Sequence, residues 1–188
     1  KYFIAGGEHF SSVPELCLEQ CKDLDAIALG EGEETIVEIA NAIDSNSSWL
    51  NIAGLVVRDN NKLIKTKKRK RLTKLDEIPK PAWDLVPINN YLDLHLTFGV
   101  DRGRTMPMLA SRGCPFQCTF CSSPTMWGTT WVARDVKLLA DEIEEYIKKY
   151  NIDAVDFYDL TAIVKKSWII EFSKELISRK LNITWQLP

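Results

Sequence analysis

Short apolar runs alternate with stretches of helical periodicity in the first part of the chain. The runs at 2–5 and 26–29 each end in glycines, as buried strands that open into tight loops do. Residues 14–21 are compatible with a short helix, and apolar side chains recur at helical spacing over 36–43. This order of strands and helices is typical of a parallel α/β sheet. The pattern predicts that residues 1–50 form the C-terminal part of a doubly wound, Rossmann-like domain.

A hairpin and a stiff connector are predicted in the middle of the chain. Two strand-like segments, 52–58 and 62–66, flank the sequence Asp-Asn-Asn at 59–61, which favours a turn. The stretch 75–83 then contains two prolines within three residues, so we expect it to be extended. We place the domain boundary in this region and assign residues 51–104 to the hairpin and the connector.

A second α/β unit is predicted over residues 105–188. Its expected elements alternate between strand and helix, with strands at 106–110, 153–158 and 183–186 and helices at 134–149 and 166–180. In the first of these helices, apolar positions mark one face and acids mark the outward face, namely Asp141, Glu142, Glu144 and Glu145.

Composition limits the class of protein. The chain has 188 residues, of which 45% are hydrophobic and 27% charged, which excludes disorder throughout. A net charge of −2 gives no attraction for nucleic acid, and no run approaches the roughly 18 unbroken apolar residues of a membrane span. The chain has neither a signal peptide nor an initiator Met. We therefore expect a fragment of a cytoplasmic protein, with no nucleic-acid partner and no membrane span.

Two further features are interpreted as structural. The run 65–71 has six basic residues among seven, and because it continues a hairpin strand we expect a solvated edge. Cys17 and Cys21 share one face of a predicted helix, where small half-buried cysteines are common.

Three more cysteines lie within eight residues, at Cys114, Cys118 and Cys121. The odd total of five, without a secretory signal, argues against disulfides and for a reducing compartment. Closely spaced thiolates are the ligands of iron–sulfur clusters. Three ligands would leave one iron of a four-iron cluster open to a small molecule. A zinc site prefers four closed ligands, so a non-catalytic module with zinc or a passive cluster is the competing interpretation.

The cysteine loop resembles the Cys-x3-Cys-x-Phe-Cys motif of the radical S-adenosylmethionine (SAM) superfamily. The resemblance implies a [4Fe–4S] cluster held by Cys114, Cys118 and Cys121, with SAM on the fourth iron and Phe120 near its adenine. In that family, reduction of the cluster cleaves SAM to a 5′-deoxyadenosyl radical. A flavodoxin or ferredoxin is then the implied reductant. Residues 105–188 would form the N-terminal half of the family's partial β/α barrel.

The resemblance also extends to an acid and two glycine loops. Asp159 ends the predicted 153–158 strand, where the family often places a SAM-binding acid; the alternative is a loop or helix-capping acid. The sequences Gly-Gly-Glu-His at 6–9 and Gly-Glu-Gly-Glu at 30–33 resemble loops that line the corrinoid in a cobalamin-binding domain before the barrel. The implied cobalamin contacts are Gly6, Gly7, His9, Gly30, Glu31, Gly32 and Glu33. The alternatives are an ordinary loop histidine at position 9 and acids at 31 and 33 that favour the start of the next helix.

Together these likenesses imply a cobalamin-dependent radical SAM enzyme, whose cofactors carry the difficult chemistry. The expected reaction is methyl transfer to an unactivated carbon of a small-molecule or lipid-like substrate. Ring formation or oxidation with the same cofactors is the enzymatic alternative. No catalytic residue is assigned beyond the cluster ligands.

Overall fold

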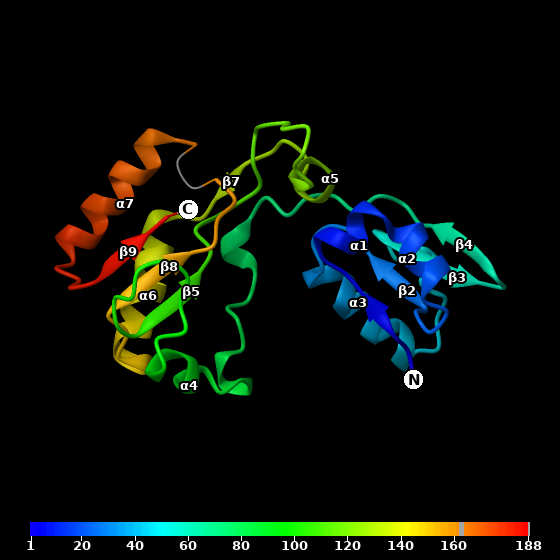
Figure 1. Cartoon of the computed structure of the whole chain (residues 1–188), viewed down its shortest axis with the longest axis horizontal. Helices are drawn as coiled ribbons and strands as arrows, with labels where there is room; N and C mark the ends of the chain where they lie inside the picture. Colours follow the sequence, from blue (N-terminus) through cyan, green and yellow to red (C-terminus); the bar gives the residue numbers. More distant parts are fainter. Residues whose placement is uncertain (162–163, 188) are drawn as a thin grey trace. The chain divides into compact units, whose positions relative to one another are not determined.

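The computed structural model describes residues 1–161 and 164–187. The chain divides into two compact units that interleave along the sequence (Figure 1). The first unit contains Lys1–Thr73 and Cys114–Thr130, and the second contains Lys74–Gly113 and the residues from Trp131 onward. Pro188, the last residue of the predicted second α/β unit, lies outside the described residues. Both units are mixed α/β structures, which confirms the predicted fold class.

The first unit is built on a four-stranded sheet with the order β1-β2-β3-β4. The strands are β1 (Ile4–Ala5), β2 (Ala26–Ala28), β3 (Leu55–Asp59) and β4 (Lys62–Lys65). β1 and β2 pair in parallel as predicted, whereas β3 and β4 are antiparallel to their neighbours. Because β3 pairs directly with β2, the hairpin extends this first sheet, although the sequence grouped it with the connector.

The hairpin turn has the geometry that its sequence predicts. Asn60 and Asn61 take positive φ angles of 46° and 62°, which two-residue hairpin turns require and asparagine tolerates. The strands continue on either side, with Asp59 opposite Lys62. The predicted hairpin is therefore confirmed.

Helices cover both faces of this sheet. On one face, the helix α3 (Glu33–Asp44) packs with strand residues into a buried cluster: Ala26, Ile39, Ala42, Ile52, Leu55 and Val57. On the other face, the helix α2 (Pro14–Gln20) places Leu18 against Ile27 and Val56. Successive strand residues point to opposite faces, so each strand contributes to both clusters. Three short helices complete the unit: α1 (Glu8–Ser12), η1 (Trp49–Asn51) and α5 (Ser123–Trp127).

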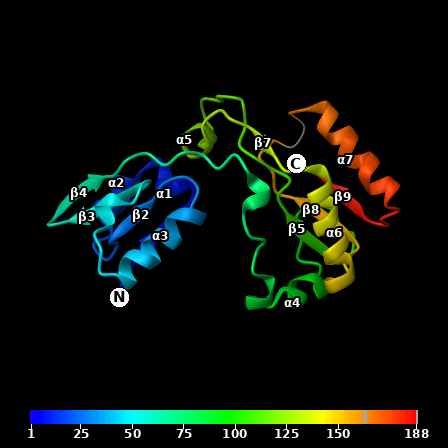
Figure 2. The same ribbon diagram turned by 180° about the vertical axis from the view of Figure 1, so that it is seen from behind.

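The second unit contains a parallel sheet with the order β5-β8-β9. Its strands are β5 (Thr105–Met108), β8 (Ala154–Phe157) and β9 (Thr184–Gln186), each within a predicted strand or one residue from it. The helices α6 (Val136–Tyr150) and α7 (Lys166–Ser178) pack beside each other on one face of this sheet (Figures 1 and 2). The predicted β-α-β-α-β order is thus confirmed.

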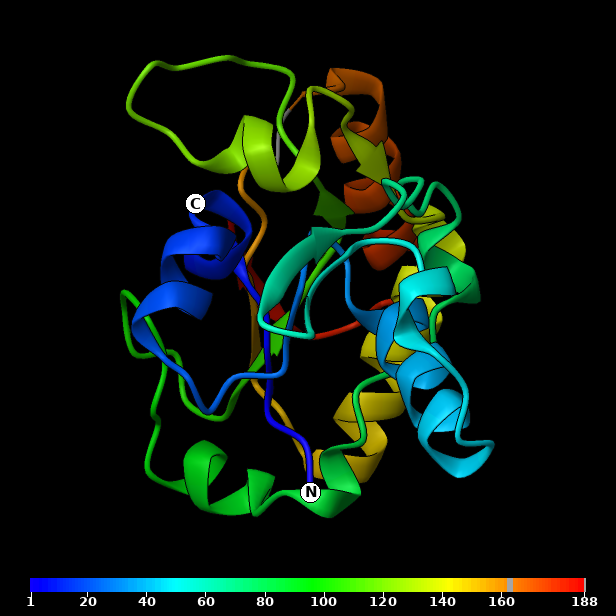
Figure 3. The same ribbon diagram turned by 90° about the vertical axis from the view of Figure 1, so that its right-hand side faces the viewer.

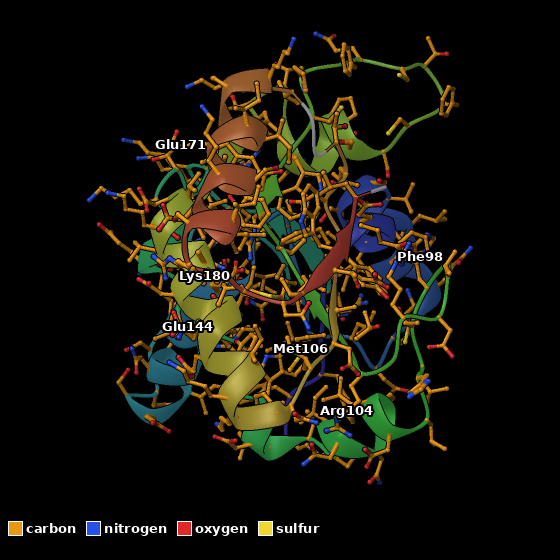
Figure 4. All side chains as sticks on the ribbon, turned by 90° about the vertical axis from the view of Figure 1, so that its left-hand side faces the viewer. Phe98, Arg104, Met106, Glu144, Glu171 and Lys180 are labelled. Atoms are coloured by element: carbon orange, nitrogen blue, oxygen red, sulfur yellow. The ribbon has the colours of Figure 1, made fainter. Side chains whose placement is uncertain are left out.

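Aromatic and aliphatic side chains form the core between the sheet and the helices. Phe157 of β8 meets Phe172 of α7 edge-on, with ring centroids 5.7 Å apart, and Trp168 stacks on Phe172 at 5.4 Å. Met106 and Val155 are fully buried in the same cluster. Glu171 and Lys180, by contrast, project from the outer side of this unit (Figure 4).

The opposite face of the same sheet is polar. Asp156 of β8 is 1% exposed and accepts a hydrogen bond from the hydroxyl of Thr97. Gln186 of β9 donates to the carbonyl of Phe98 at 2.8 Å. Phe98 lies across the sheet from the helices (Figure 4). In β/α barrels the helices lie outside, so this polar face corresponds to the interior side.

The connector packs along α6 in the second unit. It contains η2 (Leu75–Glu77), η3 (Trp83–Leu85) and the short helix α4 (Ile88–Asp93). Asp76 accepts from Arg134 at 2.9 Å and from the backbone N–H of Asp135 at 2.7 Å. Lys80 pairs with Glu145 at 2.5 Å, and the indole of Trp83 donates to the hydroxyl of Tyr146 at 3.2 Å. These contacts fix the connector to the helix surface.

One predicted outward acid of α6 is in fact buried. Glu142 is 4% exposed, and its carboxylate accepts from Arg134 at 2.7 Å. The prediction of a solvent-facing Glu142 is therefore wrong. The ion pair with Arg134 compensates for the burial of the carboxylate. None of the helices in the described part of the chain has the length and apolar character needed to cross a bilayer.

Candidate functional site

The three clustered cysteines follow the short strand β6 (Ser111–Arg112), which pairs with β7 (Val132–Ala133). They lie on an open loop that runs into α5 (Figure 3). Cys118 and Cys121 are exposed and Cys114 is partly exposed; none of them is in a disulfide. The backbone N–H of Ser123 points at the Cys121 sulfur, 3.4 Å away. Hydrogen bonds to sulfur are among the factors that tune iron–sulfur clusters.

The chemistry of this donor set fits a [4Fe–4S] cluster. All three donors are thiols, they lie on one short loop, and two reach solvent. The three sulfurs do not converge on one point in this structure. Across residues 1–161 and 164–187, no three His, Cys, Asp or Glu side chains are arranged to hold a metal ion. A closed zinc site takes four ligands, and the loop offers three cysteines.

Phe120, which the resemblance places near the SAM adenine, extends into solvent. The residue is 91% exposed, the highest exposed fraction among the large apolar residues described. Phe116 in the same loop is also exposed. Exposed aromatic faces of this size offer apolar surface that a planar ligand can cover.

The first glycine loop is shorter than the sequence suggests. Gly6 and Gly7 separate β1 from α1, and Gly7 adopts a φ of 96°, which favours glycine. Glu8 and His9 belong to the first turn of α1 and not to the loop. The His9 Nε2 lies 3.6 Å from the sulfur of Cys17, on the exposed surface.

The second glycine loop joins β2 to α3. Gly30 has a φ of 72°, and Gly32 caps α3, which begins at Glu33. Glu31 points inward, and its side chain is only 2% exposed. It accepts hydrogen bonds from Arg71 Nε at 2.9 Å and from the backbone N–H of Leu72 at 2.8 Å. Glu31 therefore has partners within the chain that the sequence did not indicate.

In the basic run 65–71 the lysines are exposed and the two arginines are partly buried. Arg69 forms ion pairs with Glu34 at 2.9 Å and Glu38 at 2.5 Å on α3. Arg71 pairs with Glu31, whereas the intervening Lys70 is exposed. The expectation of a solvated edge holds for the lysines and is wrong for the two arginines, which pair with acids of the α3 region.

Asp159 lies just beyond β8 and is buried. One carboxylate oxygen accepts from the Ala110 N–H at 3.2 Å, and the other accepts from both the backbone N–H and the hydroxyl of Ser111, the latter at 2.8 Å. Burial raises the pKa of Asp159 above its usual value, and the donors from Ser111 and Ala110 oppose that rise. Its contacts hold the strand that leads to the cysteine loop.

Sequence reasoning missed two polar groups of this region. Asp156 is an acidic residue within the otherwise apolar strand β8, and that interruption of the run was the available signal. Its Oδ1 lies 3.9 Å from Arg102 Nη1. Ser111 gave no signal, because a serine before a cysteine motif is unremarkable until Asp159 is brought to it.

Comparison with known proteins supports a family assignment. No protein-family model matches the chain. It is 33% identical over 184 residues to an uncharacterized methyltransferase of Pyrococcus horikoshii, covering 98% of this chain and 39% of that protein. It is 29% identical over 187 residues to an anaerobic magnesium-protoporphyrin IX monomethyl ester cyclase of Cereibacter sphaeroides, covering 97% and 29%. The chain thus spans less than half the length of the curated relatives it matches.

A further relative and a solved structure agree with these matches. A Streptomyces tokunonensis protein named a cobalamin-dependent radical SAM methyltransferase is 28% identical over 152 residues, covering 77% of this chain and 21% of that protein. The fold matches the cobalamin-dependent SAM radical enzyme OxsB, solved with aqua-cobalamin and SAM, at a TM-score of 0.76 and 20% identity. That match covers 97% of this chain and 25% of OxsB. Over most of its length the chain is therefore similar to a part of proteins named as methyltransferases, cyclases and cobalamin-dependent radical SAM enzymes.

Proposed function

We propose that the protein containing this chain is a cobalamin-dependent radical SAM enzyme that transfers a methyl group to an unactivated carbon of a small-molecule or lipid-like substrate. The observation that carries the proposal is the makeup of the first unit. The cysteine loop at 114–121 and both glycine loops belong to this one compact unit, although at least eighty residues of sequence separate the cysteine loop from either glycine loop. A reaction that uses both cofactors together requires their sites to be near each other.

The chain's own residues have distinct roles in this proposal. Cys114, Cys118 and Cys121 would bind the cluster, and the exposed ring of Phe120 would cover one face of the SAM adenine. Gly6, Gly7 and Gly30, with backbone that no side chain screens, would let the corrinoid approach closely. When bound, the cluster supplies the electron that cleaves SAM, and the cobalamin carries the methyl group.

Other residues serve as supports. His9, Gly32, Glu31 and Glu33 border the proposed corrinoid site, and Glu31 does so with its carboxylate already engaged by Arg71. Asp159 would act on SAM through the backbone it holds at Ala110 and Ser111. A flavodoxin or ferredoxin would deliver the electron, and the protein would work in the cytoplasm.

Anaerobic iron–sulfur reconstitution of the full-length protein tests the cluster. We expect the absorption and electron paramagnetic resonance (EPR) spectra of a [4Fe–4S] cluster, and a change in the EPR spectrum of the reduced cluster when SAM is added. A reduced cluster whose spectrum ignores SAM would reject the radical SAM proposal. Zinc retained in place of iron would support the non-catalytic module instead.

Corrinoid retention and product mass test the reaction. We expect bound cobalamin after gel filtration, and a substrate product heavier by one methylene unit. A product formed by loss of hydrogen, or by ring closure without added carbon, would replace methyl transfer by the cyclase or oxidative alternative.

A further inference from the structure

We propose that Arg71 and Glu8 are positioning residues that hold residues 122–130, which follow the cysteine loop and include α5, close to the two glycine loops. They would thereby set the distance between the cluster and the corrinoid. This inference rests on the proposed function for the identity of the two cofactors. The contacts themselves lie within the first unit and are independent of that identity.

Arg71 connects the second glycine loop to α5. Its Nε donates to the buried Glu31 carboxylate at 2.9 Å, while its Nη1 donates to the backbone carbonyl of Trp127 and to that of Thr130, the latter at 3.3 Å. The guanidinium also lies over the Trp127 ring, 5.3 Å from the centroid. Such a contact adds attraction between a cation and an aromatic face. One side chain therefore binds both segments at once.

Glu8 makes an independent connection from the first turn of α1, directly after the first glycine loop. One of its carboxylate oxygens accepts from the hydroxyl of Ser122 at 3.0 Å, and the other accepts from the indole N–H of Trp127 at 3.3 Å. Ser122 directly follows Cys121, the last of the three clustered cysteines. The acid of the Gly-Gly-Glu-His sequence thus reaches the residue next to a proposed cluster ligand.

The backbones of the two segments also approach each other closely. A Cβ atom added to Gly30 would lie 3.6 Å from the carbonyl oxygen of Met126 in α5. Glycine at this position has a φ of 72°, so another residue would strain the loop. The helices α1 and α5 also contact each other. Arg71 and Glu8 therefore bridge elements that already touch.

From the sequence alone, neither Arg71 nor Glu8 would be expected to have a structural role. Arg71 ends the basic run 65–71, whose lysines are exposed, and Glu8 lies on a five-residue helix at the surface. Arginine suits this work better than lysine, because its planar group can donate to a carboxylate and to backbone carbonyls in different directions. We therefore expect Arg71→Lys to keep the charge and lose the connection.

Chymotrypsin digestion of the full-length protein without cofactors tests the contacts. The segment 114–130 offers the enzyme Phe116, Phe120 and Trp127, and cleavage after Trp127 requires α5 to open. We expect about tenfold faster cleavage after Trp127 in Arg71→Met, because charge-assisted hydrogen bonds are of that strength. Lys70→Met, the exposed neighbour, is the matched control and should cleave at the wild-type rate.

Magnetic coupling between the reduced cluster and cob(II)alamin tests the spacing. In protein loaded with both cofactors, we expect Arg71→Met, Arg71→Lys and Glu8→Gln to change the dipolar coupling measured by pulsed EPR at unchanged iron and corrinoid content. Lys70→Met should reproduce the wild-type coupling. A role limited to stability would alter cofactor content or melting, and leave the coupling of loaded protein as it was.

The outcomes separate this inference from the proposed function. Wild-type coupling in the three fully loaded variants would overturn the spacing role alone. A wild-type protein that takes up no cluster or no corrinoid would remove the proposed function and the spacing role with it. Unchanged cleavage after Trp127 in Arg71→Met would show that Arg71 does not hold α5.

Discussion

Asp159 accepts a hydrogen bond from the hydroxyl of Ser111 at 2.8 Å, across 48 residues of sequence. The same hydroxyl also accepts from the indole of Trp131 at 3.0 Å. The end of β8 is thus joined to the strand from which the cysteine loop departs. Burial removes the hydration of the Asp159 carboxylate, which costs free energy, and the hydrogen bonds that it accepts offset part of that cost.

Asp159→Asn should change how stability depends on pH. Burial raises the pKa of Asp159, so the folded protein takes up this proton more readily than the unfolded chain does. The stability contributed by the carboxyl therefore falls as the pH rises from the usual aspartate range through the raised pKa, and is level above it. We expect the free energy of unfolding of the wild type, relative to Asp159→Asn, to be greatest in acid and to fall toward neutral pH.

Urea unfolding of both proteins across the acid and neutral range measures this difference. Asp44→Asn, at an exposed acid, provides the comparison and should show no such trend. If the free energy of unfolding of the wild type, relative to Asp159→Asn, increased toward neutral pH, a raised pKa of Asp159 would be contradicted.

Arg134→Met should be strongly destabilising. The substitution leaves Glu142 buried without its cation, and breaking a buried pair in this way costs about 3–5 kcal/mol. It also releases Asp76, so the connector should loosen from α6. The free energy of unfolding in urea measures the loss.

Two further variants define the origin of that loss. Replacing both partners, in Arg134→Met with Glu142→Leu, should recover much of the stability because no unpaired charge remains. Lys148→Met removes an exposed pair with Glu144 and should cost less than about 1 kcal/mol. If all three variants lose equal stability, the buried pair is not the cause.

Each of Cys114→Ser, Cys118→Ser and Cys121→Ser should abolish cluster formation. A hydroxyl is a poor substitute for a thiolate at iron, and three ligands leave none to spare. Iron and sulfide content after reconstitution should fall to the level found before it. Cys17→Ser and Cys21→Ser should keep the wild-type content, and a loss there would assign those cysteines a role that their position does not suggest.

Asp135→Ala should destabilise α6 by about 1 kcal/mol, because Asp135 caps its first turn. The carboxylate accepts from the N–H groups of Lys137 at 2.8 Å and Leu138 at 3.1 Å. Asp135→Ser retains a capping oxygen and should behave like the wild type in thermal unfolding. Equal melting of the alanine and serine variants would mean that the cap contributes little.

The sequence predicted the long elements of the fold well. α6 and α7 repeat apolar residues over several turns, and the strands β5 and β8 are nearly continuous apolar runs, so their signals are local. The pairing of β3 with β2 could not be predicted in this way. It depends on which strand edge is available after folding, and Val56 carries no mark of its partner Ile27.

The parts of the candidate site also differ in whether a local sequence pattern predicts them. The cysteine spacing is a local pattern and was visible, as were both glycine loops. The pairings of Glu31 with Arg71 and of Glu142 with Arg134 join residues 40 and 8 positions apart in sequence, and a charge in a sequence does not show whether it will be buried. The short helices α1 and α5 were missed because five residues are too few to show a period.

The interleaving of the two units has a consequence for how the molecule is made. The first unit needs residues 114–130 as well as 1–73, so it cannot be completed until synthesis has passed the whole connector and the strand β5. A nascent chain that has emerged only to residue 73 would expose the glycine loops and Arg71 without their partner segment. No single cut in the polypeptide separates the units, and proteolysis at the connector would leave the cysteine segment attached to the wrong fragment.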